Sequence, residues 1–63
     1  MTTEDYINYA KSFGYDLRFT GIGMAYVVLN GTVFLTKAMD TDKAERELML
    51  IGMAIMNDTV RAM

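Results

Sequence analysis

The stretch Lys43-Ala-Glu-Arg-Glu-Leu-Met-Leu-Ile-Gly-Met-Ala-Ile-Met-Asn-Asp-Thr-Val-Arg-Ala-Met63 decides the fold. It contains no proline and most of its residues favour helix, so it predicts one long C-terminal helix. Apolar residues recur along this helix in two adjacent rows at helical spacing. The first row is Ala44, Leu48, Ile51, Ile55 and Ala62, and the second, which we call the methionine row, is Met49, Met53, Met56, Val60 and Met63.

The two rows together are wider than one packing partner requires. They cover about 200° of the helix circumference, whereas packing against a single sheet uses about 100°. We assign Leu48, Ile51 and Ile55 to the core, which leaves the methionine row as a second surface. Methionine is flexible and polarizable and is common on surfaces that bind adaptable partners. We therefore predict a homodimer formed through the methionine row, unless the N-terminal helix covers that row completely.

Gly52 lies between the two rows in the middle of the predicted helix. Glycine at such a position costs about 1 kcal/mol relative to alanine. Its presence predicts the close approach of another backbone, either the sheet or a second copy of the helix.

The N-terminal residues predict a second, shorter helix over about residues 3–13. Thr2-x-x-Asp5 resembles a capping box in which aspartate replaces glutamate. Tyr6, Tyr9, Ala10 and Phe13 then share one face, and Gly14 suits the left-handed residue that ends a helix.

The middle of the chain changes to the period of a β-strand. Leu17 and Phe19 alternate with polar residues, and residues 24–29 are rich in β-branched and aromatic side chains. Asn30-Gly31 predicts a two-residue type I′ hairpin turn, after which residues 32–37 return as a third strand. Gly21-Ile-Gly23 is read as a three-residue loop between the first two strands.

These turns predict a register and therefore the two faces of the sheet. The expected pairs are Leu29 with Thr32, Val27 with Phe34, Ala25 with Thr36, Phe19 with Ala25, and Leu17 with Val27. The core face would carry Leu17, Phe19, Ala25, Val27, Leu29 and Phe34. The opposite face would carry an apolar island of Tyr26, Val28, Val33 and Leu35, which is the second candidate interface. The predicted architecture is a single α+β domain, residues 1–63, of order αβββα, with both helices on one face of the sheet.

The residue types present disfavour catalysis and metal binding. The chain has no histidine and no cysteine, which removes the commonest general base, thiol nucleophile and metal ligands. Ser12 has no obvious activating base. Gly21-Ile-Gly23 lacks the third glycine of a phosphate-binding loop. Asp40-x-Asp42-x-x-Glu45 lacks the glycine of a calcium loop, so Asp40, Thr41 or Asp42 is expected to cap the long helix. We expect no catalytic residues, no metal and no cofactor, and hence no enzyme.

The expected partners follow from charge and length. The net charge is −2 and the longest apolar run, Leu48 to Met56, is far shorter than the roughly 20 residues that span a bilayer. No signal peptide is recognisable, so we expect a cytoplasmic protein with no membrane partner. The leading hypothesis is a small non-catalytic protein-interaction module that dimerises and regulates or inhibits an unidentified protein, and its small size suits a product of a phage or mobile element. The alternative, which six Lys and Arg residues disfavour, is a dimeric β-ribbon that binds nucleic acid through Arg18 and Lys37.

Overall fold

The computed structural model describes residues 1–33 and 37–62. The elements follow in the order α1 (Thr3–Ser12), β1 (Tyr15–Gly21), β2 (Met24–Leu29), β3 (Thr32–Val33), β4 (Met39–Asp40) and α2 (Thr41–Ala62). All strand pairs are antiparallel. The chain is therefore an α+β domain of order αβββα, as predicted, with the third strand divided into two short pieces.

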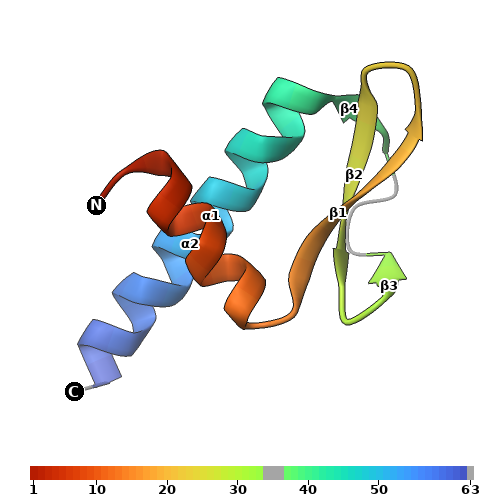
Figure 1. The fold of residues 1–63 in the computed structure, drawn as a ribbon. Helices are drawn as coiled ribbons and strands as arrows, with labels where there is room; N and C mark the ends of the chain where they lie inside the picture. Colours follow the sequence, from red (N-terminus) through yellow and green to blue (C-terminus); the bar gives the residue numbers. More distant parts are fainter. Residues whose placement is uncertain (34–36, 63) are drawn as a thin grey trace.

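Both helices lie on one side of the sheet, and α1 crosses the middle of α2 (Figure 1). The C-terminal turns of α2 extend past α1 and away from the strands (Figure 1). The molecule is consequently long and thin, with extents of 41 × 23 × 15 Å. A chain with this shape and only 63 residues has little interior in which to bury its apolar side chains.

Both helices begin at capping residues that the sequence suggested. The Thr2 side chain accepts the Asp5 backbone N–H (3.2 Å), and the Asp5 carboxylate accepts the Thr2 backbone N–H (2.9 Å), which completes the predicted capping box. The hydrogen bond that the Thr2 backbone N–H donates to the carboxylate is the main cause that lowers the pKa of Asp5, and the Thr2 side chain lowers it further. At α2, the Asp40 carboxylate accepts the Lys43 backbone N–H (2.9 Å), so Asp40 caps this helix.

The hairpin turns fix the register between β1 and β2. Asn30 and Gly31 have φ values of 51° and 83°, as a type I′ turn requires. Phe19 pairs with Ala25 and Leu17 with Val27, as predicted. The other turn is shorter than expected, because Gly21 already pairs with Met24 and the irregularity falls between Phe19 and Gly21.

The third strand departs from the predicted register. It pairs as expected next to the turn, with Leu29 opposite Thr32. Ala25, however, lies opposite Met39 in β4 and not opposite Thr36. The chain thus uses three more residues than a continuous strand would before it returns to the same edge of β2. The far end is held by the Thr41 backbone N–H, which donates to the Gly23 carbonyl (3.0 Å), and by the helix cap beside it. The predicted Val27–Phe34 pair lies outside the described residues.

The core lies where the two helices meet β2. Its fully buried residues are Ala10 of α1, Val27 of β2 and Leu48 of α2, and Ile7, Tyr15, Leu17 and Ile51 pack around them. Ala25 is also buried, while Leu29 and Ile55 are half-buried. The assignment of Leu48 and Ile51 to the sheet side of α2 is therefore confirmed.

Phe19 does not belong to the core, although the sequence placed it there. Its side chain is 64% exposed, and Ile22 in the adjoining turn is fully exposed. Phe19 shares the helix-facing side of the sheet with Ala25, but α1 packs on the beginning of β1, at the opposite end of that strand from the Ile22 turn (Figure 1). Alternation predicted the correct side of the sheet, whereas burial depends on how far the helices reach.

Gly52 permits α1 to lie directly on α2. A methyl group at Gly52 would be 2.8 Å from the carbonyl carbon of Tyr6 and still closer to its oxygen. The predicted close approach is therefore present. Its partner is the backbone of α1, and not the sheet or a second copy of the long helix.

Candidate functional site

The methionine row is partly covered by the contact between the helices. Met49, Met53 and Met56 are all half-buried. The reason is that Gly52 lies beside them on the helix surface, and α1 packs closely there. The side chain of Val60, and all of Met63, lie outside what the structure describes. The N-terminal helix thus reduces the exposure of this row without burying the described methionines.

Leu50 extends the methionine row on the side that faces away from α1. It is 47% exposed and lies one turn before Met53, so the two side chains are neighbours on the helix surface. Leu50 belongs to neither of the two rows predicted from the sequence. The helical spacing of Leu50 and Met53 indicates that they are neighbours, but the predicted interface included only the methionine row.

In the predicted apolar island on the far side of the sheet, the two side chains that the structure describes are Tyr26 and Val28, and neither is fully exposed. Val28 is only 5% exposed, and Tyr26 is half-buried. Val28 occupies the central strand, between Asp16 of β1 and Val33 of β3, and its neighbour Val27 is buried on the opposite side. β2 is therefore buried on both sides at this point. The side chain of Val33, and the whole of Leu35, lie outside the described residues.

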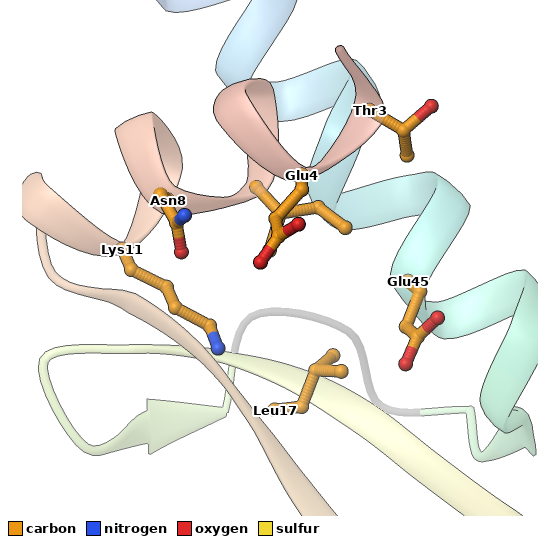
Figure 2. Close-up of a pocket in the computed structure, with 7 residues that line it drawn as sticks. Thr3, Glu4, Asn8, Lys11, Leu17 and Glu45 are labelled. Carbon is orange, nitrogen blue, oxygen red and sulfur yellow. The ribbon is translucent and has the colours of Figure 1, made fainter.

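A groove opens between α1, α2 and β1. It has a volume of about 400 Å³ and is lined by Thr3, Glu4, Ile7, Asn8, Lys11, Leu17 and Glu45. Leu17 lies at its base, with Lys11 toward one end and Glu45 toward the other (Figure 2). The groove therefore combines an apolar floor with both signs of charge at its rim.

The basic residues named in the nucleic-acid alternative are not grouped with one another. Lys37 lines a groove of about 410 Å³ together with Lys43, Arg46, Met39 and Glu47. Arg18 instead lies on β1, opposite Tyr26, and is exposed. The structure therefore replaces the predicted pair by a cluster of three cations beside the first turns of α2.

The described part of the chain shows neither a metal centre nor a membrane-spanning helix. The residues that the structure describes contain no group of three or more acidic, histidine or cysteine side chains that could hold a metal ion. Within 1–33 and 37–62, no helix is both long enough and apolar enough to cross a bilayer.

Comparison with protein-family models, with curated proteins and with solved structures found no match to this chain. The candidate site therefore rests on its own geometry.

Proposed function

We propose that this chain is a small non-catalytic protein-interaction module that self-associates and regulates or inhibits a partner protein, with a size that suits a phage or mobile-element product. The observation that supports the proposal most strongly is the imbalance between apolar content and buried core. Half of the sequence is hydrophobic (52%), yet Leu48 and Val27 are the only large side chains among the described residues that are fully buried. Apolar surface left open in this way marks interaction sites.

The surface proposed for the partner protein consists of Met49, Leu50, Met53 and Met56. These side chains are half-buried or exposed along one stripe of α2, and the C-terminal part of the helix extends beyond α1 (Figure 1). Methionine side chains can adapt their shape to a partner at a low energetic cost. Charged residues such as Arg46 flank the stripe, and a polar rim around an apolar centre is the usual anatomy of an interface.

Met53→Glu tests this surface, with Lys43→Gln as the control on the same helix. Lys43 is exposed and lies about 15 Å along the helix axis from Met53, and its substitution changes the net charge by the same amount. The tagged wild-type protein and the Lys43→Gln variant should retain the same specifically bound protein from host-cell extract, identified by mass spectrometry. Met53→Glu should lose it while its circular dichroism spectrum stays native. Equal retention by both variants would remove the methionine row from the proposal.

The second candidate function is binding of a nucleic-acid backbone. It is favoured by the groove that gathers Lys37, Lys43 and Arg46, which are three of the six cationic residues in the chain. Glu47 in the same groove opposes it. A salt titration separates the two functions, because each phosphate contact makes affinity fall steeply with ionic strength, whereas association through the methionine row should change little.

A further inference from the structure

β1 forms one edge of the sheet and provides an interaction surface separate from the methionine row. It pairs with β2 on one side, and no other described strand lies on its second side. Leu29 and Thr32, which flank the Asn30-Gly31 turn, form backbone hydrogen bonds with each other. The backbone groups of Val28 and Tyr26 therefore point toward the other side of β2, where they form hydrogen bonds with Asp16 and Arg18 of β1. Backbone direction alternates along a strand, so the N–H and C=O groups of Leu17 and Phe19 point outward from the sheet. Such an edge can pair with another chain.

We infer that two copies of this chain pair antiparallel through β1, about a two-fold axis that passes beside Leu17, and form one continuous sheet. This inference rests on the proposed function, because it assigns the proposed self-association to a defined surface. The methionine row then remains available to the partner protein. An interface with two-fold symmetry brings the same patch of both copies together, so β1 must be complementary to itself.

The backbone N–H and C=O groups that point outward from β1 allow several registers between the two copies, and the charges on β1 favour this one. With the axis at Leu17, Asp16 of each copy lies opposite Arg18 of the other. An axis one residue earlier places Asp16 opposite itself, and an axis one residue later places Arg18 opposite itself. Opposite charges across a strand pair are stabilising and like charges are destabilising. Asp16 and Arg18 are the two charged residues of β1, so the strand favours a single register.

The position of these charges suits a direct ion pair. In this register, Leu17 of one copy forms a backbone hydrogen-bonded pair with Leu17 of the other. Asp16 and Arg18 then face each other as a pair without backbone hydrogen bonds between the two copies, and at such pairs the facing side chains come closest. Both side chains are exposed. In the single chain the Asp16 carboxylate accepts the outward Leu17 N–H (2.8 Å). On pairing, this N–H is donated to the Leu17 carbonyl of the second copy, and the carboxylate is released to the Arg18 of that copy.

The helix side of the sheet is complementary in the same arrangement. Phe19 of one copy lies across from Tyr15 of the other, which gives its largely exposed ring an apolar neighbour. Lys11 and Glu45 lie toward opposite ends of the groove, on either side of Leu17 (Figure 2). A two-fold axis at Leu17 exchanges these ends, so that Lys11 of each copy approaches the Glu45 end of the other groove.

Paired charge reversals test the register. In Asp16→Arg and in Arg18→Asp, both facing pairs carry like charges, so each variant alone should have a dimer dissociation constant raised about tenfold or more. An equimolar mixture of the two variants restores opposite charges at both pairs and should form heterodimers with near wild-type affinity. Analytical ultracentrifugation measures these constants. Lys43→Asp, which makes the same charge change as Arg18→Asp but at an exposed site on α2, is the control and should dimerise normally.

Amide hydrogen exchange in the wild-type protein provides an independent measurement that requires no variant. Raising the protein concentration should slow exchange of the outward amides of Leu17 and Phe19. The amides of Asp16 and Arg18, already bonded to β2, should change little. Unchanged exchange at Leu17 across the dimerisation range would overturn the inference.

The outcomes separate this inference from the proposed function. If the wild-type protein dimerises but neither charge reversal nor the mixture alters the dissociation constant, the pairing through β1 is wrong and self-association stands. If the wild-type protein is monomeric at every concentration tested, both the β1 dimer and the proposed self-association fail. Weak dimerisation of each variant alone, together with near wild-type dimerisation of the mixture, would establish the register.

Discussion

Replacing Gly52 with alanine tests the packing of the two helices, because the change adds one methyl group in the middle of α2. In an exposed helix this substitution would stabilise the protein by about 1 kcal/mol. Here the methyl group would lie 2.8 Å from the carbonyl carbon of Tyr6 and closer still to its oxygen. The obstructing atoms belong to the backbone of α1, so no side-chain rotation can move them aside.

The expected result is a net loss of stability. Carbon atoms in contact normally lie about 3.5–4.0 Å apart, so α1 must move outward by roughly 1 Å. Overpacking of this kind costs typically about 1–3 kcal/mol. The severe overlap places Gly52→Ala near the upper value, and subtracting the gain in helix propensity leaves about 2 kcal/mol. For a domain of this size, such a loss lowers the melting temperature by roughly 8–16 °C.

Thermal unfolding followed by circular dichroism at one fixed protein concentration measures this effect, since self-association would make the melting temperature concentration-dependent. Ala54→Gly is the matched control, because Ala54 is exposed on the same helix. That control should cost about 1 kcal/mol through helix propensity alone. A melting temperature of Gly52→Ala equal to or above that of the wild type would refute the close contact between Gly52 and α1.

Two further predictions concern the helix caps. Asp40→Ala removes the cap of α2 and should cost about 1 kcal/mol in a denaturant titration, whereas Asp42→Ala should cost less, because it removes only a charge from the first turn. The hydrogen bonds from Thr2 lower the pKa of Asp5 below 3.8, so its stabilising effect is complete above that pH and is lost as the pH falls through the lowered pKa. The difference in melting temperature between the wild type and Asp5→Asn should therefore be largest at neutral pH and shrink in acid. A difference that does not vary with pH would contradict the cap assigned to Asp5.

Local sequence signals predicted the parts of the fold that short-range chemistry determines. Asn30-Gly31 fixed the hairpin because both residues accept the positive φ of a type I′ turn. Thr2 and Asp5 fixed the beginning of α1 through reciprocal hydrogen bonds. Leu48 was placed correctly because helical spacing determines which side of a helix faces the sheet.

The errors arose where burial depends on elements that are distant in the sequence. Phe19 has the alternation of a core residue, but the extent of the sheet that the helices cover is set by where α1 and α2 cross. Val28 was assigned to the surface because alternation places it opposite Val27, and a central strand can be buried on both sides. The return of β4 opposite Ala25 depends on hydrogen bonds at Gly23 and Asp40, which a strand pattern does not encode.

The candidate site was only partly accessible from the sequence. Helical periodicity identified Met49, Met53 and Met56, and the structure shows that each retains some exposed surface. The alternation along β1 was visible, but its role as an unpaired edge required the strand order. The grouping of Lys37 with Lys43 and Arg46 likewise depends on how the chain returns to α2, which residue spacing alone does not determine.

The contact between Tyr6 and Gly52 also constrains the order of folding. These residues lie near opposite ends of the chain, so α1 can dock only after most of the sequence has been synthesised and α2 has formed. A helix as short as α1 does not persist alone in water. The β1–β2 hairpin and the long helix are therefore expected to form first, and α1 to join them late. Because contacts of high sequence separation slow folding, this step would limit the folding rate of an otherwise small domain.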